Sequence, residues 1–209
     1  PYIKRGITDW NRAFERAGLK NAVRAMDLPD SIAANDGDDL RYSVLTYAAS
    51  EKANAMGTST LDPRTGEILE ADIIWWHNVH SLIREWVMVQ TGAVNPKARS
   101  LELPTELIGD AVRFVACHEV GHSLGLRHNM IASAAYPTDS LRSPSFTRRM
   151  GGTSASIMDY ARFNYVAQPE DGVEVMSPGI GPYDLMAIEW GYRWYPAGTN
   201  ERQVLEQVL

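Results

Sequence analysis

The most constraining feature of this chain is the segment 118–128, which reads His-Glu-Val-Gly-His-Ser-Leu-Gly-Leu-Arg-His. His118 and His122 are four positions apart, so on a helix they project from the same face, one turn apart. His128 comes six positions later, and on a continuous helix it would lie about 600° around and roughly 9 Å along the axis. The three imidazoles therefore meet only if the helix ends, and Gly125 stands where a residue with positive φ can turn the chain back.

Three converging imidazoles predict a catalytic zinc site. Catalytic zinc typically has three protein ligands, and neutral imidazoles leave its charge free to acidify a bound water and to polarise a carbonyl. Glu119, next to His118, is then placed to act as general base on the zinc-bound water and to pass the proton to a leaving amine. A structural zinc site would need a fourth ligand, most often cysteine. The single cysteine, Cys117, points about 100° away around the helix and is expected to be a small buried residue.

The extended motif resembles that of the metzincin zinc peptidases. That family also has a tight turn with a methionine below the metal, and Met158, in Ser-Ile-Met-Asp-Tyr at 156–160, matches it. The resemblance implies that Met158 forms an apolar floor under the imidazoles without binding the metal. It also implies that Tyr160 stabilises the transition-state oxyanion, since a phenol can donate a hydrogen bond to developing negative charge. A tyrosine that only packs is the alternative for Tyr160.

Composition and charge restrict the classes of partner. With 209 residues, 44% hydrophobic and 22% charged, the chain can form one domain with a sizeable core. It has no apolar run of eighteen residues, so no membrane-spanning segment is expected. The net charge of −6, without a basic stripe, argues against a nucleic-acid partner. Because the chain begins at Pro1 and ends in an amphipathic pattern, we expect a catalytic domain from a longer protein with flanking domains. Separately, we expect the protein to be exported, as a periplasmic, cell-surface or secreted protein.

In the N-terminal half, the apolar pattern predicts one helix, several strands and a hairpin. The helix, at 2–17, is expected to pack on a sheet and to end at Gly18. Strands are predicted at 21–28 and at 40–49, the second with Tyr42, Val44 and Leu45 facing inward, and a solvated acidic turn is predicted at 35–39. The turn signal at 62–66 separates a polar edge run, 56–61, from a more apolar and central run, 67–76. A helix at 78–91 and a connector at 92–103 complete this half.

Two features of this half bear on binding. In metzincins an antiparallel edge strand lies above the metal and pairs with the substrate, which is a general mode of peptide binding. The resemblance therefore assigns substrate binding to the segment Met56, Gly57, Thr58, Ser59 and Thr60; an ordinary hairpin edge is the alternative. His77 and His80 have a spacing that could hold a second metal, but no carboxylate nearby in sequence completes such a site, so capping or packing is expected.

The C-terminal half predicts the active-site helix at 105–124, which begins at Pro104-Thr105, and shorter helices at 144–150 and 182–190. The order of elements resembles an α+β metzincin with a twisted mixed sheet, an antiparallel edge strand, an irregular lower subdomain and a C-terminal helix. On the run from Asp62 to Trp76 together with the zinc motif, the chain resembles large bacterial zinc metalloproteases. We expect one domain, 1–209, with subdomains at about 1–125 and 126–209. Metzincins begin their sheet before the first long helix, so a first strand is expected to be missing.

These observations favour a zinc-dependent endopeptidase that acts on peptide or protein substrates, with Zn²⁺ as its cofactor. Two alternatives stay open. The domain could be a zinc-containing peptide-binding or structural module without cleavage activity, or an amidase that acts on non-peptide substrates through the same site. Specificity is expected to come from a pocket wall at 160–180, where Arg162, Phe163, Tyr165 and Met176 are unranked candidates.

Overall fold

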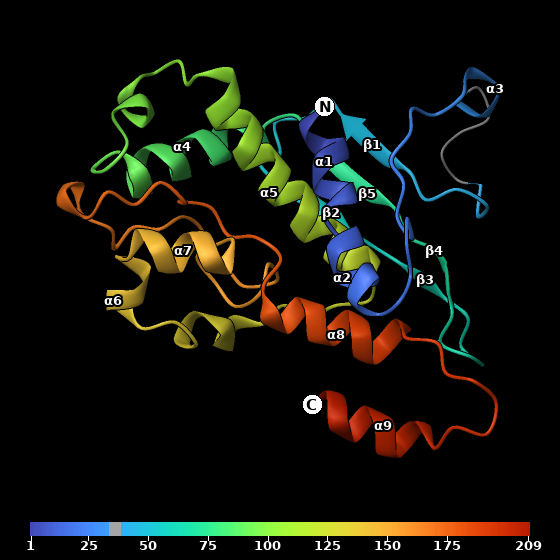
Figure 1. Cartoon of the computed structure of the whole chain (residues 1–209). Helices are drawn as coiled ribbons and strands as arrows, with labels where there is room; N and C mark the ends of the chain where they lie inside the picture. The colour runs from blue at the N-terminus through green and yellow to red at the C-terminus, as the bar shows by residue number, and fades with distance from the viewer. Residues whose placement is uncertain (34–38) are drawn as a thin grey trace.

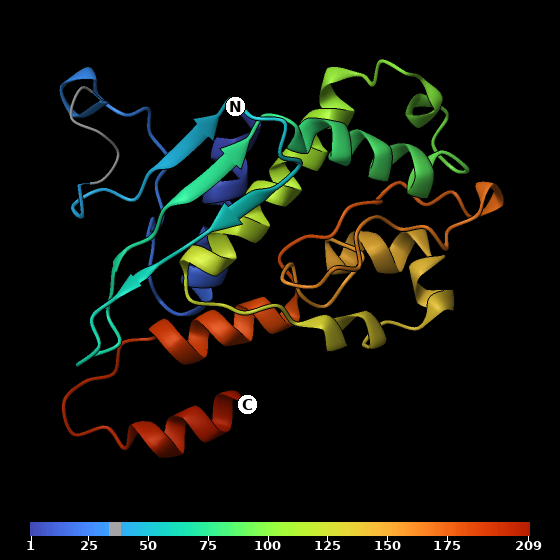
Figure 2. The same ribbon diagram turned by 180° about the vertical axis from the view of Figure 1, so that it is seen from behind.

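A central helix, α5 (Thr105–Ser123), organises the fold (Figure 1). The computed structural model describes residues 1–33 and 39–209. In it, α1 (Tyr2–Thr8) packs along one side of α5 and a β-sheet covers the other side, so that α5 lies between these two layers in both opposite views (Figure 2). This arrangement of helices and a sheet confirms the predicted α+β class.

The sheet is small and mixed. Its strand order is β1–β5–β2, with β1 parallel and β2 antiparallel to the central strand β5. The run around Ile73 and Trp75 was predicted to be central, and both side chains are buried in the core. The edge strand β2 contacts α5, so the predicted antiparallel edge lies beside the active-site helix. The bounds of the strands are β1 (Leu45–Ala48), β2 (Ala55–Gly57) and β5 (Ile73–Trp76).

A second, two-stranded ladder surrounds the predicted turn at 62–66. It consists of β3 (Thr60–Leu61) and β4 (Ile68–Glu70), which pair antiparallel. Gly66 has a φ of 77°, a conformation that favours glycine. The run predicted as one strand at 56–61 is therefore divided between two ladders, and only its beginning belongs to the sheet that covers α5.

The end of α5 has the geometry that the sequence predicts. Leu126 donates its N–H to the carbonyl of Gly121 at 3.0 Å, and Gly125 donates to His122 at 2.9 Å. Gly125 has a φ of 87°. These two bonds and the left-handed residue form a Schellman motif, which satisfies the last carbonyls of the helix and reverses the chain. The reversal leads directly to His128.

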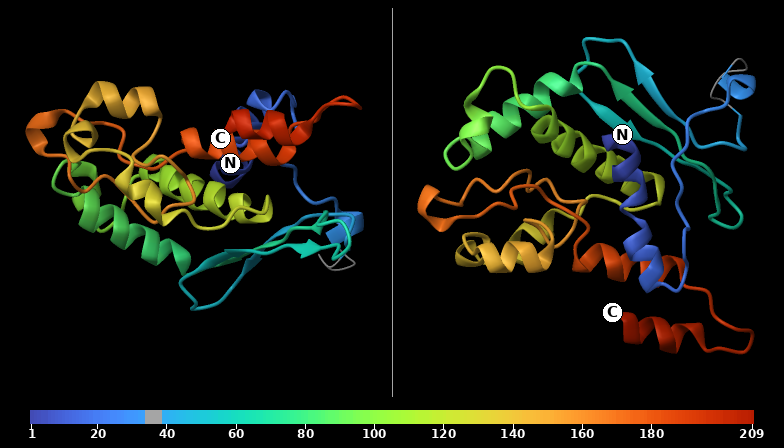
Figure 3. Two further views of the ribbon diagram at one scale, coloured as in Figure 1. Left: turned by 90° about the horizontal axis from the view of Figure 1, so that it is seen from below. Right: turned by 45° about the horizontal axis from the view of Figure 1, so that its top comes forward.

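The lower half of the molecule consists of short helices and long loops below α4 and α5 (Figure 1 and the right-hand view of Figure 3). The predicted helices at 78–91, 144–150 and 182–190 are present, although the last one continues through Gly191 to Tyr192. No helix in residues 1–33 and 39–209 is long and apolar enough to cross a membrane. The remaining bounds are α3 (Asp30–Ala33), α4 (Val79–Thr91), η1 (Pro96–Arg99), η2 (Met130–Ala134), α6 (Thr138–Leu141), α7 (Pro144–Met150), η3 (Pro169–Asp171), α8 (Pro182–Tyr192) and α9 (Glu201–Val208).

The N-terminal helix differs from its prediction in two ways. The segment 2–17 forms two helices, α1 and α2 (Asn11–Arg16), because the chain turns at Asp9 and Trp10. Its apolar side packs on α5 and α8 rather than on a sheet. The buried Trp10 donates its ring N–H to the carbonyl of Cys117 at 2.9 Å, and a Cβ on Gly6 would lie 2.5 Å from the carbonyl oxygen of Arg113. The close contact between helices thus requires the glycine.

One strand prediction was wrong, and another was too long. Residues 21–28 form no strand; instead, the side chain of Asn11 bonds both the N–H and the carbonyl of Val23, at 3.0 and 2.7 Å, and so satisfies them without a neighbouring strand. The strand predicted at 40–49 is shortened to β1, so Tyr42 precedes it and is exposed. The predicted acidic turn at 35–39 lies outside the described residues, except for Asp39.

Candidate metal centre

Three imidazoles converge at the end of α5. The Nε2 atoms of His122 and His128 are 3.0 Å apart, and those of His128 and His118 are 3.2 Å apart. Four ligands arranged tetrahedrally around zinc at about 2.05 Å would lie about 3.3 Å from each other. Because one nitrogen of each ring points to the same centre, the three histidines are positioned to bind a metal ion.

Backbone carbonyls fix the orientation of two of these rings. The Nδ1 atom of His118 lies 2.8 Å from the carbonyl oxygen of Ile157, and that of His122 lies 2.9 Å from the carbonyl oxygen of Leu126. A carbonyl can only accept, so each Nδ1 carries the proton and each Nε2 lone pair is left for a metal. Burial lowers the pKa of His118 to about 4, so its imidazole is neutral at pH 7, the form that binds metal.

Glu119 lies beside the three rings and is held from the edge strand. Its Oε2 accepts a hydrogen bond from the N–H of Gly57 at 2.7 Å. A Cβ on Gly57 would lie 2.4 Å from the carbonyl oxygen of Glu119, so β2 approaches α5 this closely only with glycine at that position. Burial raises the pKa of Glu119, and the bond from Gly57 opposes this rise. The carboxylate is thus fixed in position, and it is more basic than the carboxylate of an exposed glutamate.

Met158, which the resemblance assigns to the floor under the rings, packs against the segments that carry them. It is fully buried, and its sulfur packs against α5 at Gly121, where an added Cβ would lie 2.2 Å from Sδ. Its own carbonyl accepts from the N–H of Asn129 at 2.9 Å, which ties the turn to the segment after His128. The methionine turn therefore contacts both the helix and the returning chain that carry the imidazoles.

A buried aspartate holds this turn from α8. Asp184 accepts hydrogen bonds from Ser156 Oγ at 2.6 Å, from the N–H of Ile157 at 2.7 Å and from the N–H of Gly181 at 2.8 Å. The carbonyl of Ile157 in turn accepts from His118. Sequence reasoning missed Asp184, although Gly181-Pro182-Tyr183-Asp184 has the pattern of a helix start with an acidic residue that caps it. This pattern does not reveal that Asp184 also accepts hydrogen bonds from the methionine turn.

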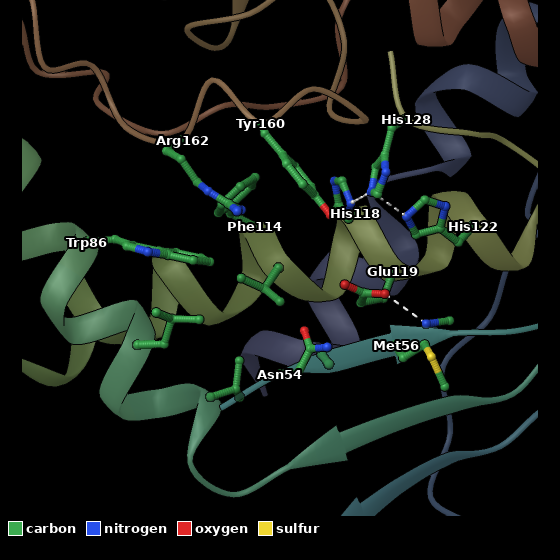
Figure 4. Close-up of a pocket in the computed structure, with 15 residues that line it drawn as sticks. Asn54, Met56, Trp86, Phe114, His118, Glu119, His122, His128, Tyr160 and Arg162 are labelled. Atoms are coloured by element: carbon green, nitrogen blue, oxygen red, sulfur yellow. Dashed lines mark hydrogen bonds between the residues drawn. The ribbon is translucent and has the colours of Figure 1, made fainter. Parts of the chain in front are cut away.

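Tyr160 contacts the imidazoles from the opposite side of the cleft. Its ring centroid lies 4.3 Å from that of His128 and 5.6 Å from that of His118. Figure 4 shows its hydroxyl directed toward His118. The tyrosine that the resemblance singled out is therefore near the metal centre, at a place from which a phenol can reach a reacting group.

The cleft at this site has a volume of about 320 Å³, and its walls come from α4, α5, β2 and the loop after Met158. Of the four candidates for its wall, only Arg162 lines it. Phe163 is buried beneath it against Phe114, Tyr165 is exposed to solvent, and Met176 lines a different cavity. The lining also includes Trp86 of α4, which the sequence analysis did not assign to the site.

The proposed substrate segment is only partly a strand. The backbone carbonyl of Asn54 accepts a hydrogen bond from the N–H of Trp76, and the backbone N–H of Thr58 donates one to the carbonyl of Asp72. These backbone groups therefore face the segment of the central strand β5. Gly57 alternates with them and faces the cleft, where it bonds Glu119. Met56 is one of the residues that line the cleft, whereas Ser59 lies between the two ladders and Thr60 begins the second.

The other histidine pair plays no part in this centre. Tyr47 hydrogen bonds the ring of His77, and His80 bonds the carbonyl of His77 at 2.8 Å. Within the described ranges, 1–33 and 39–209, only His118, His122 and His128 form a group that could hold a metal ion.

A protein-family model described as Met-zincin matches residues 100–209, just over half of the chain. The match begins before α5 and covers all three imidazoles, the methionine turn and both C-terminal helices. No curated protein and no solved structure matches the chain.

Proposed function

This chain belongs to the Met-zincin family, and from that premise we propose that it is a zinc-dependent endopeptidase. One observation carries the proposal: Glu119 is held by the Gly57 N–H beside three convergent imidazoles, and it faces an open cleft. A zinc site that only stabilises a fold is closed by four protein ligands and needs no base. An open cleft with a positioned carboxylate is the arrangement that hydrolysis requires.

The proposed chemistry divides between the metal and the side chains. Zinc, when bound by His118, His122 and His128, supplies a Lewis acid that polarises the peptide carbonyl and acidifies water. Glu119 removes a proton from the attacking water and transfers it to the leaving amine. The hydroxyl of Tyr160 donates a hydrogen bond to the oxyanion that forms as the carbonyl is attacked.

The substrate backbone is proposed to bind along the edge that begins at β2. An extended peptide can pair with an edge strand through main-chain hydrogen bonds. We assign this role to the predicted segment from Met56 to Thr60, of which Met56 lines the cleft. Gly57 has a second role, since its N–H positions the base. A peptide or protein is therefore the proposed substrate, and the same strand positions both the substrate and Glu119.

The test combines a metal measurement with a cleavage measurement. The purified chain should contain one zinc per molecule, and it should cleave members of a mixed peptide library until the zinc is chelated. Glu119→Gln should keep the zinc and lose at least about 10³-fold in kcat, as expected for the loss of a general base. Glu106→Gln, an exposed change on the same helix, is the matched control and should keep both zinc and turnover.

Other results would point elsewhere. A chain without stoichiometric zinc, or a Glu119→Gln variant that cleaves as well as the wild type, contradicts the proposal. A chain that binds zinc and cleaves no peptide is a binding or structural module, and one that cleaves only non-peptide amides is an amidase.

A further inference from the structure

Arg162 is a half-buried cation at one end of the cleft. Its guanidinium carbon lies 3.9 Å from the ring centroid of Trp86 and 4.3 Å from that of Tyr160. Figure 4 shows the three side chains next to each other, with His122 at the other end of the site. No carboxylate hydrogen bonds this guanidinium within residues 1–33 and 39–209, although the field of Glu119 reaches it. Arg162 therefore carries a charge into the cleft without a direct anionic partner.

Two other partly exposed arginines of this chain are neutralised by nearby carboxylates. Arg113 donates two hydrogen bonds to Asp9, at 2.7 and 2.6 Å. Arg142 donates two to Asp171, at 2.8 and 2.9 Å. A guanidinium is planar and matches a carboxylate through paired N–H donors. Unlike these two, Arg162 lines the cleft, where a ligand can supply the carboxylate that its guanidinium lacks.

The backbone holds Arg162 in an unusual conformation. Its φ is 58°, in the left-handed region that a residue with a long side chain rarely adopts. The next residue, Phe163, is fixed by an N–H bond to Gln90 Oε1 at 2.9 Å and by a ring contact with Phe114 at 5.8 Å. Strained conformations of this kind persist where the surrounding structure enforces them, commonly at ligand sites. The contacts of Phe163 thus fix the backbone next to Arg162.

The shape of this end of the cleft suits a side chain with an apolar stem and a charged tip. The lining of the cleft includes the apolar residues Val79, Leu82, Phe114 and Val115 as well as Arg162. The rings of Trp86 and Tyr160 take the faces of the guanidinium, which leaves the N–H donors in its plane for hydrogen bonds.

We propose that Arg162 binds a carboxylate of the substrate, so that the enzyme selects an Asp or Glu side chain at a position beside the scissile bond. This inference rests on the proposed endopeptidase function. A free C-terminal carboxylate offers the same chemistry, and the experiment separates it from a side chain. A purely structural role for Arg162, in which it only supports Tyr160, predicts no preference for acidic residues.

The test is cleavage-site profiling with two peptide libraries of the same sequences, one amidated and one with free C-termini. The wild type should enrich Asp and Glu at one position beside the cleaved bond in both libraries. Arg162→Gln should lower the ratio of kcat/KM for Glu peptides to that for matched Gln peptides by about 10- to 100-fold, the size expected for a lost charged hydrogen bond. Arg162→Glu should shift the preference at that position to Lys and Arg, which a misfolded protein cannot produce.

Arg202→Glu is the matched control, since it makes the same charge change on the exposed helix α9. It should retain the wild-type preference. The proposal is overturned if acidic residues are not enriched, if Arg162→Gln keeps the enrichment, or if cleavage requires a free C-terminus. The last result would assign Arg162 to binding of the chain end.

A binding measurement keeps this inference separate from the proposed hydrolysis. The side-chain Nε–H signal of Arg162, identified by its loss in Arg162→Gln, should shift in NMR spectra on addition of N-acetyl-aspartate N-methylamide. The asparagine analogue, which lacks the carboxylate, should not shift the Nε–H signal. A chain that cleaves nothing but shows this shift refutes the endopeptidase and retains the carboxylate site. A chain that cleaves peptides while neither ligand moves the signal refutes the carboxylate site alone.

Discussion

The two walls of the cleft hold their functional groups by different means. On the α5 side, His118, Glu119 and His122 are placed by the repeat of one helix, and the turn at Gly125 brings back His128. On the opposite side, the groups depend on partners that are distant in sequence, such as Gln90 for the loop at 162–163 and Asp184 for the methionine turn. The reactive chemistry is thus encoded in one short segment, whereas the binding surface is assembled by the whole fold.

The largest expected effect breaks the long-range hydrogen bond that holds Glu119 on the α5 side. Gly57→Ala would place a Cβ 2.4 Å from the carbonyl oxygen of Glu119, which pushes β2 away and breaks the bond that holds the base. Because general base catalysis depends on position, we expect kcat to fall about 10³-fold. Zinc content is measured in parallel, because the added Cβ would also lie 3.2 Å from the Cβ of His122. A variant that keeps its zinc and loses turnover places the effect at Glu119.

Gly66→Ala provides the control for this variant. Gly66 also has to be glycine, because its φ is 77°, but a Cβ there meets nothing within 4 Å and lies outside the cleft. The variant should lose about 1–2 kcal/mol of stability and keep its turnover. Comparable losses of turnover in both variants would mean that Gly57 acts only through stability.

A smaller effect is expected from the opposite wall. Tyr160→Phe keeps the ring that stacks on Arg162 and removes only the hydroxyl, so it tests the proposed oxyanion donor. Loss of one such donor typically costs about 10²-fold in kcat, and KM should change little. Tyr165→Phe, an exposed tyrosine on the same loop, is the matched comparison. Unchanged turnover in Tyr160→Phe would remove Tyr160 from the mechanism.

The smallest expected effect is a change in stability with pH, and it arises from Asp184, which holds the methionine turn of this wall. Burial raises the pKa of Asp184 to about 6, although its three hydrogen bonds lower it. The folded state therefore binds the proton more tightly than the unfolded chain, whose aspartate has a pKa of about 4. The resulting stability is fully present below pH 4 and is lost as the pH rises through 6.

Asp184→Asn cannot titrate and lacks this dependence. We expect the unfolding free energy of the zinc-free wild type, minus that of the variant, to fall by no more than about 3 kcal/mol between pH 4 and 7. Urea unfolding across this range measures the difference, from which the titration of His118, common to both proteins, cancels. A difference that rises with pH would show that the carboxylate form of Asp184 is the stabilising one.

The sequence predicts the metal centre and the order of most elements because these depend on local rules. The spacing of the residues within 118–128 is enough to place the three imidazoles together, and the turn at 62–66 is set by residues that favour turns. The failures occurred where a distant side chain decides the outcome. The pattern at 21–28 predicts a strand, but Asn11 bonds the backbone of Val23 in this segment. Arg162 could not be ranked within 160–180 without Trp86 from α4.

The chain reversal at Gly125 has a thermodynamic consequence. The imidazoles of His118 and His122 belong to α5, whereas that of His128 belongs to the loop that leads into the lower half. A ligand that binds all three at once links these two parts, and it stabilises only conformations in which they are together. Metal binding and the cohesion of the two halves are therefore one coupled equilibrium, so a protein depleted of metal should open along the cleft before α5 itself unfolds.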